Sequence, residues 1–232
     1  MGGNWMEPQL IALIAATAFF VGSHFAMSHP LRASMVRALG PTGFQGVYSL
    51  VSAAALVWMY FAFKAIDAPA LPLWAGFDDA SWVVGSAFAL LGAVLLAGSF
   101  LGNPALPAPG AEQAARQEPA GVLRVTRHPM MWGISLIGIG HLVAAPTSRT
   151  LVVMGAVIFL ALVGARMQDR KKEALMGDAW RVWENRTSYW PKWSRLLQVK
   201  PALWLAGAAL WLLFTWLHTP AGGLPAGVWR WI

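Results

Sequence analysis

Two histidines of this chain lie inside strongly apolar segments. His24 and His141 stand within stretches 8–27 and 129–146, which contain no Asp, Glu, Lys or Arg. An ionisable residue in such a segment is costly, usually faces the interior of a helix bundle and indicates a functional site. Neutral imidazole is the commonest metal ligand, and two histidines from separate helices can hold a haem or another metal. The alternative is that each ring is neutral and bonded to a neighbouring backbone carbonyl or serine.

A second candidate group consists of Arg124, Arg127 and His128, directly before Pro129 and its apolar run. Cations oppose the partial positive charge at a helix N-terminus. Together with the free backbone N–H groups of that terminus, however, they would favour an anionic ligand group. The alternative is that these cations only fix the topology and contact lipid phosphate.

Helix geometry limits how these residues can combine. His128 and His141 are 13 residues apart, about 20 Å along one helix, so they cannot bind one metal atom. His141 lies about 18 Å from the start of its segment and His24 about 5 Å from the end of its own. Sharing one iron would therefore require a tilt or a kink. The apolar segments hold no Asp or Glu, which argues against carboxylate proton transfer there, and no catalytic residue is assigned.

Composition indicates a membrane protein that positions these residues on helices. The 232 residues are 57% hydrophobic and 12% charged, about half the charge of soluble domains. Cysteine is absent, and the 14 tryptophans suit membrane–water boundaries. We expect an all-α helix bundle forming one domain over 1–232, with one cytoplasmic interfacial helix and six spans of roughly 20 residues. The spans are about 8–27, 43–65, 82–101, 129–146, 149–167 and 201–218.

Charge asymmetry predicts the orientation. Of the 17 Lys and Arg, all but Lys64, Arg149 and Arg230 fall in loops 28–42 and 102–128 or in 166–200. Basic loops face the cytoplasm, so both termini are expected outside. The net charge of +7 is then explained by contact with membrane lipid, and no nucleic-acid partner is expected.

Two further segments carry predictions. Residues 102–120 are rich in Pro, Gly and Ala and indicate a mobile loop that could cover a site. Within 167–193, a helical stripe of Met176, Ala179, Trp180 and Trp183 predicts an amphipathic helix on the membrane surface, or alternatively a lid near Arg127 and His128.

Glycines recur along the third and fourth spans. They allow close helix packing or leave room for a flat cofactor. The residues are Gly85, Gly92, Gly98, Gly133, Gly138 and Gly140.

Three stretches resemble the NnrU family: GSHFAMSHPLR (22–32), GVLRVTRHPMMWGISLIGIGHLVAAP (121–146) and MQDRKKEALMGDAW…TSYWP (167–191). This resemblance implies a bacterial inner-membrane protein linked to denitrification and nitric oxide metabolism. The family is similar to 15-cis-zeta-carotene isomerase, a haem b enzyme that resembles this chain in the same stretches. This resemblance implies haem b with His24 and His141 as ligands. Arg124, Arg127 and His128 would then bind a haem propionate or a substrate anion. Gly138 stands in place of the isomerase's cysteine, so thiolate ligand switching cannot occur.

A more distant resemblance runs to the isoprenylcysteine carboxyl methyltransferases. It rests on Arg127-His128-Pro129, Asp169 and Gly177…Trp180…Trp183, and implies S-adenosylmethionine as cofactor, although Gln168-Asp169 replaces the usual paired glutamates. Three hypotheses therefore stay open. They are a haem-b protein that acts as an isomerase of a lipophilic polyene or serves nitrogen-oxide metabolism, a membrane methyltransferase, and a non-catalytic assembly factor. Exposed Trp and Gly faces are compatible with a dimer.

Overall fold

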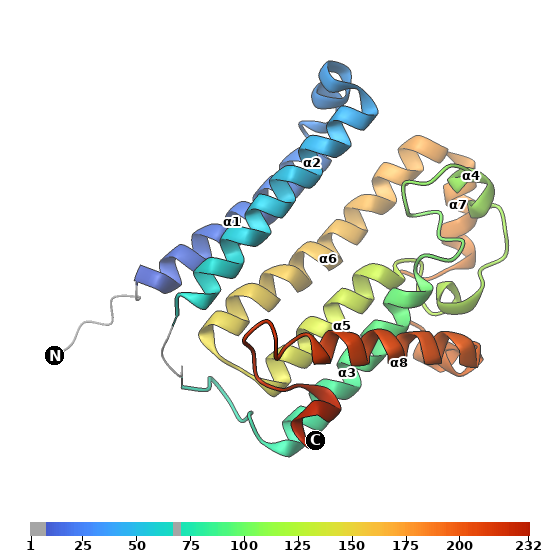
Figure 1. The fold of residues 1–232 in the computed structure, drawn as a ribbon. Coiled ribbons are helices and arrows are strands. Elements are labelled where there is room, and N and C mark those ends of the chain that lie inside the picture. The colour runs from blue at the N-terminus through green and yellow to red at the C-terminus, as the bar shows by residue number, and fades with distance from the viewer. Residues whose placement is uncertain (1–7, 67–70) are drawn as a thin grey trace. The chain divides into compact units, whose positions relative to one another are not determined.

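Helices make up the regular structure of the protein (Figure 1). The computed structural model describes residues 8–66 and 71–232, and within these ranges it contains helices and no strand. The longer helices are α1 (Pro8–Ser28), α2 (Arg32–Lys64), α3 (Asp79–Gly98), α5 (Pro129–Ala144), α6 (Ser148–Met176) and α8 (Pro201–Trp216). The shorter ones are α4 (Ala111–Ala115), α7 (Asp178–Arg186), η1 (Gly121–Arg124), η2 (Trp193–Gln198) and η3 (Gly227–Arg230).

The long helices confirm the prediction of an all-α membrane protein. By length and composition, α1, α2, α3 and α6 can each cross a membrane. Helices α5 and α8 are also apolar but have 16 residues each. The six helices correspond to the six predicted spans. The N-terminal residues 1–7, which we expect outside the membrane, lie beyond the described part of the chain.

Local sequence sets where these helices begin and break. Pro129 and Pro201 occupy the first position of α5 and α8, where the missing N–H of proline costs no helix hydrogen bond. The Asp78 side chain caps α3 by accepting a hydrogen bond from the Ser81 N–H at 2.8 Å. Helix α2 starts at Arg32, earlier than the predicted 43, and is interrupted at Gly40 (φ 71°) before Pro41. The predicted start therefore marks the helical segment after this break.

Described contacts group the chain into two units. Unit 1 comprises residues 1–74 and 146–157, and unit 2 comprises residues 75–145 and 158–232. In unit 1, α1 and α2 lie side by side (Figure 1), joined by three residues, 29–31. Their core contains Leu13, Ala16, Met59 and Ala62 together with Val153.

Glycine pairs bring α3 and α5 of unit 2 into backbone contact. A Cβ built on Gly92 would lie 2.6 Å from the Gly133 carbonyl oxygen, and one on Gly133 would lie 2.7 Å from the Gly92 oxygen. Gly85 and Gly140 repeat this arrangement at 2.7 and 2.6 Å. These four glycines therefore serve helix packing, the first of the two predicted roles, and leave no space for a flat cofactor between them.

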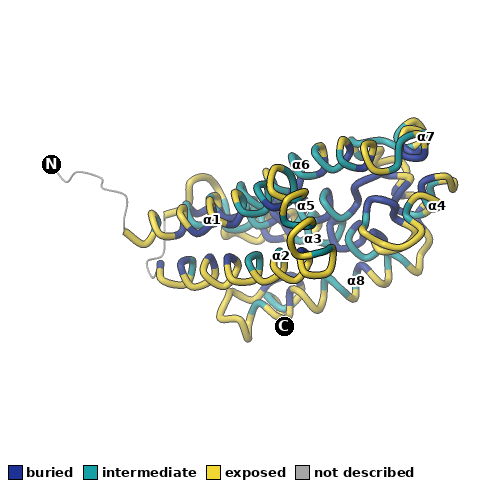
Figure 2. The backbone as a smooth tube through the Cα atoms, turned by 90° about the horizontal axis from the view of Figure 1, so that it is seen from above, coloured by how far each residue is buried: buried dark blue, intermediate teal, exposed yellow. Residues whose placement is uncertain are grey.

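Segment 167–193 differs from the single surface helix that we expect from its sequence. Its first part continues α6 to Met176, and Gly177, at φ 54°, separates α6 from α7. Buried segments gather where α7 and α4 lie near each other (Figure 2). The apolar stripe of Ala179, Trp180 and Trp183 packs there with Ala105, Ala115 and Leu123. The stripe is covered by the protein's own loop, so it does not face lipid.

Hydrogen bonds hold loop 102–120 against α6, whereas its sequence predicts a mobile loop that could cover a site. The Lys172 ammonium donates hydrogen bonds to the Pro104 and Leu106 carbonyls at 2.8 and 3.1 Å, and the Gln168 amide donates to the Ala105 carbonyl at 2.8 Å. Buried Lys172 thus satisfies carbonyls of a loop with little regular structure.

Candidate functional site

Arg127 and His128 meet Asp169 of α6 in a buried cluster of unit 2. The Arg127 guanidinium binds both Asp169 carboxylate oxygens, with Nε–Oδ1 at 3.0 Å and Nη2–Oδ2 at 2.7 Å. His128 Nε2 lies 2.7 Å from the same Oδ1. His128 is 2% exposed, and Arg127 and Asp169 are 7% exposed each. Such bidentate, charge-assisted bonds are strong and fix geometry. A carboxylate thus stands beside the cations that precede α5.

Helix α7 contributes a second carboxylate to this cluster. Glu184 Oε1 lies 3.2 Å from Arg127 Nη2. The Arg127 guanidinium therefore faces two carboxylates and offers less positive charge to an external anion than its sequence context suggests. Helix α7, which belongs to the segment for which a lid near Arg127 and His128 is the alternative prediction, thus contacts Arg127. Sequence reasoning missed Glu184, since it stands among other charged residues on the polar face of α7 and carries no distinguishing signal.

Segment 187–192 closes over the residues that precede α5. The Tyr189 carbonyl accepts hydrogen bonds from Thr126 Oγ1 and Trp132 Nε1 at 2.8 and 2.9 Å. Two backbone hydrogen bonds of 2.8 Å, Arg127 N–H to the Ser188 carbonyl and Lys192 N–H to the Val125 carbonyl, run alongside. The TSYWP and RVTRHP stretches are thus direct structural partners.

The Tyr189 side chain lies against the cations of the cluster. Its ring centroid is 5.8 Å from the guanidinium carbon of Arg127 and of Arg166, and 5.7 Å from the His128 ring. Its hydroxyl donates to the Leu162 carbonyl at 2.6 Å. The second nitrogen of His128, Nδ1, is buried without a partner in the described structure.

The other predicted site residues lie elsewhere. Arg124 is exposed, its Nε donates to the Pro119 carbonyl at 3.0 Å, and it makes no contact with Asp169. Trp180, which the methyltransferase hypothesis uses, is buried in the cluster with Ala105 and Leu123. His141 stands near the end of α5, about 20 Å along the helix from His128. The structure therefore joins Arg127 and His128 but separates them from Arg124 and from His141.

His24 of unit 1 and His141 of unit 2 share one local geometry. Each ring places Nδ1 at 2.8 Å from the carbonyl oxygen four residues earlier, Phe20 for His24 and Ile137 for His141. This is the backbone bond that the alternative interpretation expects. Because Nδ1–H donates in that bond, Nε2 carries the lone pair. In His24, Nε2 lies 3.4 Å from the Ser52 hydroxyl oxygen.

His141 has a neighbour that sequence reasoning missed. The His218 ring stacks on the His141 ring with centroids 5.7 Å apart and planes 24° apart, and His218 Nδ1 also bonds its own helix, at 2.8 Å from the Phe214 oxygen. His218 is the final residue of the last predicted span, a position that indicates only an interfacial residue. Within 8–66 and 71–232, no group of three or more His, Asp or Glu is placed to hold a metal ion.

Ionisation of Glu184 makes a testable contribution to stability. Burial raises its pKa above the ordinary 4.5; Asp169 and Glu173 also raise it, and Arg127 lowers it. Because the folded state binds this proton more tightly than the unfolded state, the contribution is most favourable below pH 4.5 and is lost as pH rises through the folded pKa. We therefore expect Glu184→Gln to gain thermal stability relative to the wild type between about pH 4 and pH 7.

The measurement is the thermal midpoint of both proteins in mild detergent across that pH range. A Glu184→Gln variant that matches the wild type at the acidic end and is less stable at neutral pH would contradict the prediction. That result would mean that attraction to Arg127 outweighs burial.

Comparison with known proteins places the chain. Neither a curated protein nor a solved structure matches it. The family model described as NnrU protein matches residues 12–226, nearly the whole chain, including all three stretches on which the resemblance rests. On this match, the chain belongs to the NnrU family.

Proposed function

We propose that this NnrU-family protein binds haem b through histidines of its apolar helices, and that His141 and His24 are the residues that would hold it. One observation carries the proposal. Both rings have Nδ1 committed to a carbonyl of their own helix, which leaves Nε2 as the nitrogen that could coordinate iron; in His24 the iron would replace the 3.4 Å contact of Nε2 with the Ser52 hydroxyl. Metal-binding histidines commonly use such a bond to fix their tautomer and orientation.

The residues present fit a haem ligand in chemistry as well as in tautomer. Both histidines stand on apolar helices without other ionisable side chains, and imidazole is a common ligand of haem iron. Bound haem would supply redox-active iron. The chain's own contribution would be to orient the imidazoles and present an apolar surface to a lipophilic substrate. Arg127 and His128 directly precede α5, about 20 Å along the helix axis from His141, and the resemblance that implies haem assigns them to a propionate or a substrate anion.

This proposal suits two activities: a redox-dependent cis–trans isomerase of a lipophilic polyene, and an accessory protein of denitrification or nitric oxide metabolism. In either case we place the chain in a bacterial inner membrane, with both termini periplasmic. The support is the distribution of Lys and Arg, 14 of which fall in the loops predicted to be cytoplasmic or, as Arg166 does, at their rim.

The test is an absorption spectrum of protein purified in mild detergent, oxidised and then reduced with dithionite. We expect a Soret band at near-stoichiometric haem that His141→Ala abolishes. His24→Ala should also abolish or shift it, because a bis-histidine site loses a ligand. His218→Ala is the matched control, since His218 has the same Nδ1 bond and stacks on His141.

Two other spectroscopic results would change the ligand assignment or overturn the proposal. A spectrum that survives His24→Ala but not His218→Ala would replace His24 by His218 as second ligand. A colourless wild-type protein from haem-replete cells would overturn the haem proposal.

A second candidate function is an S-adenosylmethionine-dependent methyltransferase. It is favoured by the contact of Arg127 and His128 with Asp169, the residues on which that resemblance rests. Equilibrium binding of labelled S-adenosylmethionine to the wild type, lost in a folded His128→Ala variant, would support it. If neither haem nor S-adenosylmethionine binds, the non-catalytic assembly factor is the hypothesis that stands.

A further inference from the structure

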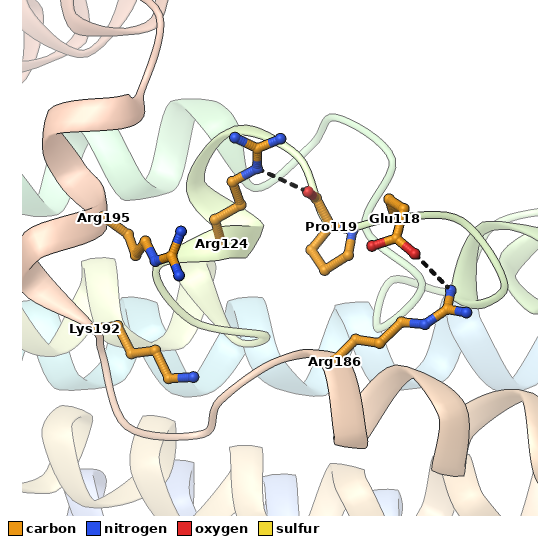
Figure 3. A pocket seen from close by; sticks show the side chains of 6 residues that line it. All are labelled: Glu118, Pro119, Arg124, Arg186, Lys192 and Arg195. Atoms are coloured by element: carbon orange, nitrogen blue, oxygen red, sulfur yellow. Dashed lines mark hydrogen bonds and ion pairs between the residues drawn. The ribbon is translucent and has the colours of Figure 1, made fainter.

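A basic cavity opens beside the buried Arg127 cluster on the surface of unit 2 (Figure 3). Its volume is about 350 Å³, within the range of small-ligand pockets. The lining residues are Glu118, Pro119, Arg124, Arg186, Lys192 and Arg195. Four of these six carry a positive charge and one a negative charge. Arg186 Nη1 lies 3.4 Å from the Glu118 carboxylate, which leaves the cavity with a surplus of positive charge.

Several N–H groups that line this cavity have no acceptor in the described part of the protein and could donate hydrogen bonds to a ligand. Arg124 uses its Nε on the Pro119 carbonyl at 3.0 Å, and its two terminal nitrogens have no protein acceptor among the described residues. Arg195 uses Nη1 on the Gln198 side chain at 3.1 Å. The Lys192 ammonium has no acceptor among the described residues. Figure 3 shows these side chains around one space, with Arg186 directed toward Glu118.

Backbone bonds hold the cationic residues at this place. The Lys192 N–H donates to the Val125 carbonyl at 2.8 Å, and the Arg195 N–H donates to the Lys192 carbonyl at 2.9 Å. Arg124 ends η1, and Arg195 belongs to η2. The arrangement of the cations therefore follows from the same pairing that closes segment 187–192 over the start of α5.

Large apolar side chains stand exposed beside the cations. Trp190, Trp193 and Leu197 are 67%, 45% and 90% exposed. The two indoles rest on the Trp132 ring with centroids 5.3 and 6.4 Å away, so they are supported from within the protein. Exposed Trp next to Lys and Arg is typical of the membrane–water interface, where indoles lie at headgroup level.

From these observations we propose that the cavity binds the phosphate group of an anionic phospholipid headgroup. The arginines and Lys192 would contact the phosphate, and Trp193 and Leu197 would contact the lipid at the acyl boundary. Basic pockets at the cytoplasmic ends of membrane helices bind lipid headgroups in this way. A soluble phosphate compound shares the phosphate chemistry but makes no use of the exposed apolar side chains.

The experiment measures lipid binding to the full chain in mild detergent. Phosphatidylglycerol is the probe, phosphatidylcholine the neutral lipid, and glycerol phosphate the soluble competitor. We expect phosphatidylglycerol to bind at least tenfold more tightly than phosphatidylcholine. The variant Lys192→Gln with Arg195→Gln should weaken phosphatidylglycerol binding at least tenfold. The matched control, Lys200→Gln with Arg170→Gln, removes the same charge from exposed residues that do not line the cavity.

The remaining outcomes overturn the proposal in distinguishable ways. Equal loss of binding in both double variants would show a general charge effect without a specific site. Binding of glycerol phosphate as tight as that of the lipid would identify a soluble phosphate ligand instead. Unchanged lipid binding in the Lys192→Gln, Arg195→Gln variant would show that the cavity is not the lipid-binding site. Thermal midpoints in phosphatidylcholine check that both variants are folded, which we expect because the substituted side chains are exposed.

Discussion

Asp169→Asn is expected to destabilise the protein by about 3–5 kcal/mol, the cost of leaving a buried ion pair without one partner. Asp169 neutralises Arg127 through two hydrogen bonds and accepts a third from His128. An asparagine keeps the shape but has no charge and one acceptor atom fewer. Glu184, 3.2 Å from Arg127, offers partial compensation, which places the expected loss at the lower end of that range.

The loss can be measured as the free energy of unfolding in mild detergent, followed by tryptophan fluorescence. Glu184→Gln is the matched control, because it is the same carboxylate-to-amide change on the same guanidinium. Glu184 makes one contact at 3.2 Å, is less buried than Asp169 and is held in a site where burial disfavours its charge, so we expect its change to cause no loss of stability at neutral pH. Equal effects of the two substitutions would mean that Asp169 is not the principal counter-ion of Arg127.

The helices could be predicted from the sequence because each depends on local information. A run of apolar residues defines each of α5, α6 and α8 without reference to the rest of the chain, a proline marks the start of α5 and of α8, and a short connection separates α5 from α6. The break in α2 was also present in the sequence as Gly40-Pro41. What local information does not show is whether an apolar stripe faces lipid or protein. Trp180 and Trp183 are compatible with both environments, and the structure buries them in the protein against Ala105 and Leu123.

The candidate site was predictable only in part because it depends on contacts distant in sequence. Arg127 and His128 stood out by their position before Pro129, but their partner Asp169 is more than 40 residues away. Only resemblance to methyltransferases drew attention to Asp169. Nothing in the sequence separates Glu184 from the other charged residues of α7, and nothing pairs His218 with His141. Such pairs follow from helix packing, which a single sequence does not specify.

Helix packing also fixes the positions of both candidate sites, because they lie at the two ends of the short helix α5. Helix α5 carries the Arg127 cluster at its beginning and His141 near its end, and the pairs Gly92–Gly133 and Gly85–Gly140 fix it against α3 between them. The seam has a seven-residue spacing on α5, so both glycines lie on one face of the helix. His141 directly follows Gly140 and is thereby held at a fixed position relative to α3.

Gly92→Ala is accordingly expected to destabilise the protein by about 3 kcal/mol, the upper end of the usual cost of overpacking. The new methyl group would lie 2.6 Å from the Gly133 carbonyl oxygen and 2.8 Å from Ile137 Cγ1. The first of these atoms is backbone and cannot move without shifting α5 as a whole. The free energy of unfolding in detergent measures the effect.

Gly164→Ala in α6 is the matched control, because a Cβ there meets nothing within 4 Å. Alanine in an open helical position loses less backbone entropy than glycine, so this variant should gain up to about 1 kcal/mol. The two glycine-to-alanine substitutions are therefore expected to change the free energy of unfolding in opposite directions. If Gly92→Ala is as stable as Gly164→Ala, then α3 and α5 do not touch through their backbones, and the glycine seam does not set the position of His141.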